Sequence, residues 1–160
     1  MASKAGKWHG RVAGAAAQDF GVVVFSPAGE RVGFVGGEGE GPGEFSNLQS
    51  IFPFRGDSLL AWDERLQRVS VLTADGALGR VARVEGQAMN PRLLRPFADG
   101  SFLRLDEHFE LSGGGTKQQI MVPTLHDAGG ALVDSLGELP FTKTVVIGSG
   151  SDMQVGLPGF

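Results

Sequence analysis

The chain has 160 residues, the size of one ordinary domain, and a formal net charge of −4. Its 26 Gly and 8 Pro exclude a long-helix protein or a coiled coil, because both residues destabilise helices, while 41% apolar residues with 11 Phe exclude a disordered chain. The negative charge argues against nucleic acid as a partner, and the absence of Cys excludes disulfides and thiolate metal sites.

Short runs of β-branched or large apolar residues, separated by Gly- and Asp-rich turns, predict strands along the chain. The first three lie near 11–16, 21–25 and 31–35. Eight more are predicted at 50–54, 58–62, 68–72, 78–84, 92–97, 101–105, 118–125 and 131–136. Beyond Pro140 only 143–147 has a strand pattern, and no amphipathic helix is predicted, so we expect an all-β fold.

Nothing in the chain predicts a membrane span or an export signal. No apolar run reaches the roughly 18 residues that a membrane-spanning helix needs. Residues 1–9 are polar, with Lys4 and Lys7, and no apolar stretch follows them. We therefore expect no signal peptide in this chain.

The strand pattern repeats at intervals of 43 to 54 residues. Four short antiparallel strands in a repeat of about this length are typical of one blade of a β-propeller. Three pairs of segments carry the repeat: Phe54-Arg-Gly-Asp-Ser-Leu59 with Phe97-Ala-Asp-Gly-Ser-Phe102, Val24-Phe-Ser-Pro-Ala-Gly29 with Val71-Leu-Thr-Ala-Asp-Gly76, and Ala74-Asp-Gly-Ala-Leu78 with Ala128-Gly-Gly-Ala-Leu132.

The segment Gly36-Gly-Glu-Gly-Glu-Gly-Pro-Gly-Glu-Phe45 resembles the inter-blade signature of bacterial six-bladed β-propellers of the NHL-like type. Gly56-Asp-Ser-Leu-Leu-Ala-Trp-Asp63, Arg68-Val-Ser-Val-Leu72 and Ala74-Asp-Gly76 continue the pattern of that family. The resemblance covers roughly 20–105. It implies a ligand- or protein-binding scaffold, often in envelope or secreted proteins, with no shared catalytic residues.

We therefore expect residues 1–160 to form one incomplete β-propeller of four-stranded antiparallel blades, at about 9–45, 46–88 and 89–140, with an incomplete blade at 141–160. These blades are too few to close a ring, and the sequence favours a fragment of a larger propeller. The alternatives are one member of a ring of several chains and an open stack with exposed edges. Exposed blade edges, above all near 143–147, predict self-association.

The Gly-rich segment 36–43 is a candidate ligand site. It contains no nucleotide-binding Gly motif, and Glu38, Glu40 and Glu44 would repel a phosphate. Carboxylates and backbone carbonyls suit calcium better. The competing interpretation is a linker between blades, in which Gly residues adopt positive φ and Glu44 bonds to nearby backbone.

Asp63-Glu64 and Asp106-Glu107 occupy equivalent positions in the repeat, 43 residues apart. An Asp at the end of a strand can accept the backbone N–H groups of the following turn. Alternatively, calcium-dependent lactonases built on propellers hold their metal with carboxylates near the central channel. On that interpretation Asp63 and Asp106 are the candidate metal ligands.

The third copy contains an insertion of about ten residues near 108–117 that follows Asp106 and Glu107. His108, set between carboxylates, could act as a general base or metal ligand, so Asp106, Glu107 and His108 are the candidate catalytic residues. The alternative is a flexible, solvated loop. His9 and His126 form no metal-binding motif with His108.

Eight of the ten Arg lie between Arg55 and Arg104, where six acidic residues leave a local charge of +2. The pairs Arg80/Arg83 and Arg92/Arg95 could bind a carboxylate ligand or an acidic partner, or could simply face solvent on outer strands. The sequence favours a non-catalytic scaffold that binds a protein or a small molecule and uses no cofactor. The rival function is a calcium-dependent hydrolase of the lactonase type.

Overall fold

The described part of the chain consists of antiparallel β-strands. The computed structural model describes residues 6–8, 11–16, 19–73, 75–86, 88–112, 116–147 and 153–158. These residues form three sheets and contain no α-helix, which confirms the prediction of an all-β protein. Within them, no helix has the length and apolar character needed to cross a membrane.

Each sheet is built around a four-stranded meander in which neighbours in sequence are hydrogen-bonded neighbours in space. The first sheet contains β1 (Gly6–Trp8), β2 (Arg11–Ala16), β3 (Gly21–Phe25) and β4 (Arg31–Gly36). The central sheet contains β5 (Leu48–Phe54), β6 (Ser58–Asp63), β7 (Arg68–Leu72) and β8 (Leu78–Arg83). The third sheet contains β9 (Met89–Pro96), β10 (Phe102–Ser112), β11 (Thr116–His126) and β12 (Leu132–Ser135), and β11 also pairs with β13 (Leu139–Ile147), followed by β14 (Met153–Pro158).

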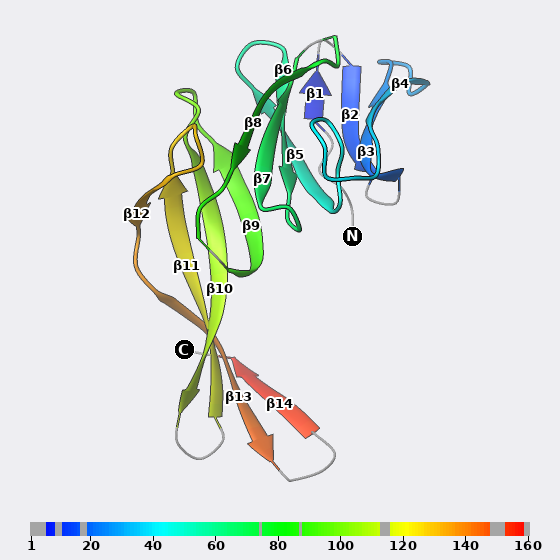
Figure 1. Ribbon diagram of the computed structural model, residues 1–160. Coiled ribbons are helices and arrows are strands. Elements are labelled where there is room, and N and C mark those ends of the chain that lie inside the picture. Colours follow the sequence, from blue (N-terminus) through cyan, green and yellow to red (C-terminus); the bar gives the residue numbers. More distant parts are fainter. Residues whose placement is uncertain are drawn as a thin grey trace.

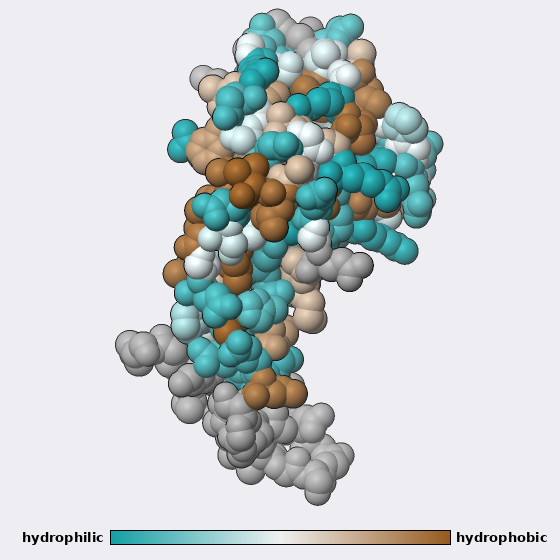
Figure 2. All heavy atoms as spheres, turned by 60° about the vertical axis from the view of Figure 1, so that its left-hand side comes forward, coloured by the Kyte–Doolittle hydropathy of each residue, from teal (hydrophilic) through white to brown (hydrophobic). Residues whose placement is uncertain are grey.

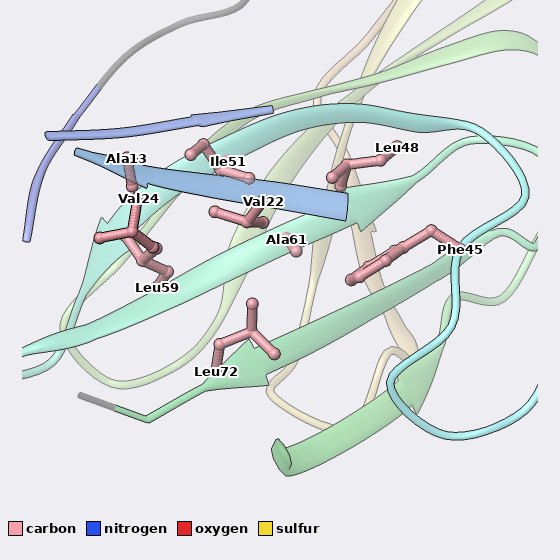
Figure 3. Close-up of a cluster of buried hydrophobic side chains, with 9 residues drawn as sticks. All are labelled: Ala13, Val22, Val24, Phe45, Leu48, Ile51, Leu59, Ala61 and Leu72. Atoms are coloured by element: carbon pink, nitrogen blue, oxygen red, sulfur yellow. The ribbon is translucent and has the colours of Figure 1, made fainter. Parts of the chain in front are cut away.

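The central sheet lies between the other two, and each of its faces contributes to a separate core (Figure 1). Leu59 and Ala61 point toward the first sheet and pack with Val22 and Val24, as Figure 3 shows. Leu60 and Trp62 point the other way and pack against Leu93 and Phe102 of the third sheet. Burial of both faces explains why β6 is an almost continuous apolar run rather than an alternating one.

The insertion in the third copy extends a hairpin, contrary to the expectation of a flexible loop. β10 and β11 pair in continuous register from Phe102 opposite His126 to Ser112 opposite Thr116. The distal halves of these strands project from the body together with β13 and β14 (Figure 1). The tip at 113–115 lies outside the described residues.

The strand at 143–147 is not a free edge, which corrects the prediction of self-association there. β13 is hydrogen-bonded to β11 on one side and to β14 on the other, so its backbone groups already have partners.

The three sheets form an open stack and do not close into a ring. The outer face of the first sheet and that of the third sheet carry no further sheet from the described residues. Figure 2 shows apolar side chains gathered on the side of the molecule where the third sheet lies. The described chain confirms antiparallel sheets, while their arrangement as blades of an incomplete propeller stays a prediction.

Candidate binding surfaces

Asp63 ends β6, and its carboxylate is completely buried. Its Oδ2 accepts hydrogen bonds from the backbone N–H groups of Ser46 at 2.7 Å and Asn47 at 3.1 Å. Its Oδ1 accepts a third from the N–H of Leu66 at 2.9 Å. Asp63 therefore ties the segment before β5 to the turn after β6, and both of its oxygens are already bonded to backbone.

The Gly-rich segment is held by the protein's own side chains. Arg68, at the start of β7, donates from Nη1 to the carbonyl of Glu40 at 2.7 Å and from Nη2 to the carbonyl of Gly41 at 2.9 Å. Nη2 also donates to the carbonyl of Glu44, whose own carboxylate accepts the N–H of Gly41 at 2.9 Å. Phe45 is fully buried in the core between the first two sheets. The segment is thus built as a linker between sheets.

Asp106, Glu107 and His108 lie within β10, where successive side chains point to opposite faces. Asp106 and His108 share the face that carries Arg104, whereas Glu107 lies on the other face, opposite Met121, with 7% of its surface exposed. The three candidate catalytic side chains are therefore not brought together.

Asp106 is the partner of Arg104, an arginine that is almost completely buried between the central and third sheets. The Nη2 of Arg104 donates to Oδ2 of Asp106 at 2.7 Å, and its Nε donates to Oδ1. This two-pronged ion pair satisfies the guanidinium away from water. Asp63 and Asp106, although equivalent in the repeat, thus have different partners.

The described residues contain no group of three or more Asp, Glu or His side chains that could hold a metal ion. The calcium and hydrolase interpretations stay predictions that depend on residues from elsewhere. His9, in the N-terminal segment, lies outside the described residues.

His126, which the sequence analysis set aside, is a fully buried polar residue at the end of β11. Its Nδ1 lies 3.2 Å from the carbonyl oxygen of Gly130 and its Nε2 lies 3.0 Å from Oγ1 of Thr124. The ring stacks on Phe102 with centroids 5.4 Å apart. Burial and the nearby Arg104 guanidinium lower the pKa of His126. A neutral ring donates from Nδ1 to the carbonyl, and its Nε2 can accept the Thr124 hydroxyl proton, which the carbonyl of Arg104 also attracts at 3.3 Å.

A surface pocket of about 240 Å³ lies between two turns that are equivalent in the repeat. One turn, Arg55–Asp57, joins β5 to β6, and the other, Phe97–Ser101, joins β9 to β10. Pro53 and Pro96 complete the lining together with Phe54, Gly56 and Ala98. Sequence reasoning identified these turns as repeats but gave no reason to expect a hollow between them.

Arginine side chains lie over the aromatic rings of this pocket. The guanidinium of Arg55 is 5.7 Å from the ring centroid of Phe54, and its Nε donates to the carbonyl of Ala98 at 2.6 Å. Arg95 lies 5.9 Å from the ring of Phe97, a pocket residue that is 38% exposed. Each arrangement is favourable because the face of an aromatic ring attracts a cation. The pocket therefore combines apolar rings with positive charge.

The predicted arginine pairs have different surroundings. Arg92 and Arg95 are both exposed on β9, as a binding role requires. Arg83 is exposed, but Arg80 is half-buried, and its Nη2 atom is buried without a hydrogen-bond partner in the described chain. Arg95 is thus the member of these pairs that contacts a residue of the pocket, Phe97.

No family model matches the sequence, and no curated protein matches it either. The fold does match solved structures. A crystal structure of a Bacteroides fragilis protein described as exported aligns with a TM-score of 0.65 at 15% sequence identity, over 96% of this chain and 49% of that one. The chain thus spans about half the length of that protein, and the likeness concerns the fold alone.

The assignment to bacterial six-bladed propellers of the NHL-like type is wrong. No propeller family matches the chain, and its sheets form an open stack. The motifs that suggested that family have local structural causes: the Gly-rich segment wraps around Arg68, and Asp63 holds the neighbouring backbone. Such motifs mark joints between small antiparallel sheets and do not by themselves identify a family.

Proposed function

We propose that the protein is a non-catalytic binding scaffold whose pocket between the β5–β6 and β9–β10 turns takes a carboxylate group attached to an apolar body. The observation that supports this best is Arg55, which is held across the pocket by its bond to Ala98 and lies over the ring of Phe54. A guanidinium matches a carboxylate in shape and charge, and the rings of Phe54 and Phe97 offer apolar contact.

Two arginines lie against the aromatic rings of the pocket and would attract an anion. Arg55 lines the pocket, and Arg95 lies over the ring of Phe97, one of its lining residues; the two turns also contain Asp57 and Asp99. The pKa of Asp99, in the β9–β10 turn, is lowered chiefly by the hydroxyl of Ser101 and in small part by Arg55. Oδ1 of Asp99 accepts hydrogen bonds from the N–H and the hydroxyl of Ser101, so this carboxylate stabilises its own turn.

Titration with 3-phenylpropanoate, followed by amide NMR, tests this function. We expect saturable shifts at Gly56 and Ala98, and about tenfold weaker binding in Arg55→Gln, because a charge-assisted hydrogen bond is lost. The matched control is Arg65→Gln, which removes an exposed arginine of the β6–β7 turn. Equal binding of the uncharged alcohol 3-phenylpropanol, or equal affinity in the two variants, would refute a carboxylate site.

Calcium dependence distinguishes this scaffold from the rival lactonase-like hydrolase. The oxygens of Asp63 are bonded to backbone and those of Asp106 to Arg104. We therefore expect added calcium to leave the melting temperature unchanged. A rise in melting temperature that disappears in Asp63→Asn and Asp106→Asn would instead support the hydrolase.

We also propose that the three meanders are successive blades of an incomplete propeller and that the protein acts in the cell envelope or outside the cell. Similar meanders packed in series support the first proposal. The second is supported by the description of the Bacteroides fragilis protein as exported. Fractionation of cells that express the natural gene tests the location.

A further inference from the structure

The contact between the central and third sheets has a defined form. The end of β8 meets the turn that joins β11 to β12: the N–H of Glu85 donates to the carbonyl of Gly130 at 2.9 Å, and the N–H of Leu132 donates to Oε2 of Glu85 at 3.1 Å. The approach is so close that a Cβ atom at Gly130 would lie 2.0 Å from the carbonyl oxygen of Arg83.

A close approach also occurs between the first and central sheets, here to a side chain. Gly76, in the turn between β7 and β8, is the repeat equivalent of Gly130, and a Cβ atom there would lie 2.9 Å from Cγ2 of Val35 in β4. In both contacts the last strand of one sheet reaches the final turn of the next sheet. At both contacts between sheets, a turn glycine of one sheet therefore lies against the last strand of the preceding sheet.

This contact has two partners, a turn glycine and the end of a last strand. At each end of the stack one of these partners has no counterpart among the described residues. Gly29, in the β3–β4 turn, is the repeat equivalent of Gly76 and Gly130, but no heavy atom lies within 4 Å of a Cβ built there. Gly137, just after β12, is equally open. Glu138 follows β12 much as Glu85 follows β8, and it is exposed.

The outer face of the third sheet is the equivalent of a face that is covered in the central sheet. Leu103 and Leu105 correspond to Leu60 and Trp62, which are completely buried beneath the third sheet. Their own side chains are only partly buried, and they lie on the face opposite Phe102 and Arg104. Exposed apolar side chains continue along the edge of this sheet at Leu132, Val133, Leu136, Leu139 and Phe141.

The outer face of the first sheet is the matching surface. Phe34 lies on it, paired with Val23, and is 39% exposed, and neighbouring Val32 is 50% exposed. The guanidinium of Arg31 lies 5.6 Å from the ring centroid of Phe34, next to the open Gly29 turn. The first end therefore offers an apolar face with Arg31 beside the open Gly29 turn. The other end offers an apolar face on which Arg92 and Arg95 of β9 lie opposite Leu105 and Leu103, with Glu138 just beyond β12.

We propose that two copies of this chain dock head to tail, with the outer face of the first sheet of one copy covering the outer face of the third sheet of the other. The Gly29 turn then meets the end of β12, as Gly130 meets β8, and Arg31 lies beside Glu138 of the other copy. Such a contact joins two different surfaces and must close on itself to give a finite assembly. Two copies together reach the length of the Bacteroides fragilis chain, about half of which this chain matches.

Sedimentation equilibrium over a range of concentrations tests the proposal. We expect a dimer for the wild-type chain and a dissociation constant at least tenfold higher for Arg31→Glu and for Glu138→Arg, because each reversal places like charges together. The double variant R31E/E138R restores the opposite charges and should dimerise like wild type. Arg65→Glu, a charge reversal in an exposed turn of the central sheet, should leave the dimer unchanged.

Far-UV circular dichroism of each variant verifies that it remains folded. A wild-type chain that stays monomeric at every concentration overturns the proposal. Dimers that neither single reversal weakens, or a double variant as weak as the single ones, also overturn it. Arg55→Gln, in the β5–β6 turn of the central sheet, tests carboxylate binding at a residue outside the proposed contact.

Discussion

His126 shows how a buried polar residue limits the conditions under which this fold is stable. Its ring is enclosed between Phe102, Thr124 and the turn at Gly130. Protonation would place a second positive charge near Arg104 in a fully buried site. The folded protein therefore holds the imidazole in its neutral form.

This environment predicts a loss of stability in mild acid. The pKa of His126 is lowered in the folded state from about 6.5, so the unfolded chain binds the proton first as the pH falls. The stabilisation is fully present above that value and is lost as the pH falls toward the folded pKa. Urea unfolding between about pH 7 and pH 5.5 should show a falling free energy of unfolding, and His126→Asn should flatten that dependence. An equally steep dependence in the variant would contradict the assignment.

The sequence predicted some polar residues of this protein better than others. The backbone-capping interpretation of Asp63 could be reached from its place at a strand end. The roles of Arg104 and His126 could not, because Arg104 also bonds to Gln67 of the central sheet and His126 stacks on Phe102 of another strand, contacts between segments far apart in the chain. The pocket was missed for the same reason, since its walls come from two turns about 43 residues apart.

At the scale of elements, the sheets are joined by turn glycines at defined positions. Gly29, Gly76 and Gly130 all have positive φ, between 84° and 92°. The conformation alone favours Gly, because a Cβ atom is disfavoured there. What differs between the three turns is the contact that the preceding sheet makes with them.

Alanine substitutions at two of these glycines separate conformation from packing. Gly29→Ala should lower the free energy of unfolding by about 1–2 kcal/mol, because only the backbone conformation is strained. Gly130→Ala should cost about 3 kcal/mol or more, because its Cβ would also collide with the carbonyl of Arg83. Chemical denaturation measures both. Equal losses would show that the close approach at Gly130 relaxes freely.

Strands were predictable where their apolar pattern was unambiguous. The four strands of the central sheet were predicted within about two residues of their observed bounds. The extension of β10 and β11 was missed because Gly and charged residues near 108–117 suggest a loop. There the pairing of β11 with β13, a contact between distant segments, prevails over local propensity.

At the scale of the whole molecule, three sheets are stacked in series and share two separate cores. Stability in such an arrangement is close to a sum of contacts between neighbours. The sequence predicted the repeating unit, but a repeat does not define how its copies close. That depends on the angle between sheets, which many side chains set together.

Two adjacent leucines test the independence of the cores. Leu59 belongs to the core of the first and central sheets, and Leu60 to the core of the central and third sheets; both are completely buried. Each Leu→Ala change should cost about 2–5 kcal/mol. Hydrogen exchange should rise mainly in β2–β4 for Leu59→Ala and mainly in β9–β11 for Leu60→Ala. The same exchange pattern in both variants would indicate one cooperative core.

The hydrogen bonds from Arg68 to the Gly-rich linker have a consequence for synthesis on the ribosome. The linker's carbonyls are bonded by a side chain that is made more than twenty residues later, and Asp63 likewise holds the backbone of Ser46 and Asn47. The first sheet emerges before either residue, with its inner face of Val22 and Val24 uncovered. A nascent chain that pauses before Arg68 should therefore recruit chaperones that recognise apolar strands, and translation through β7 should release them.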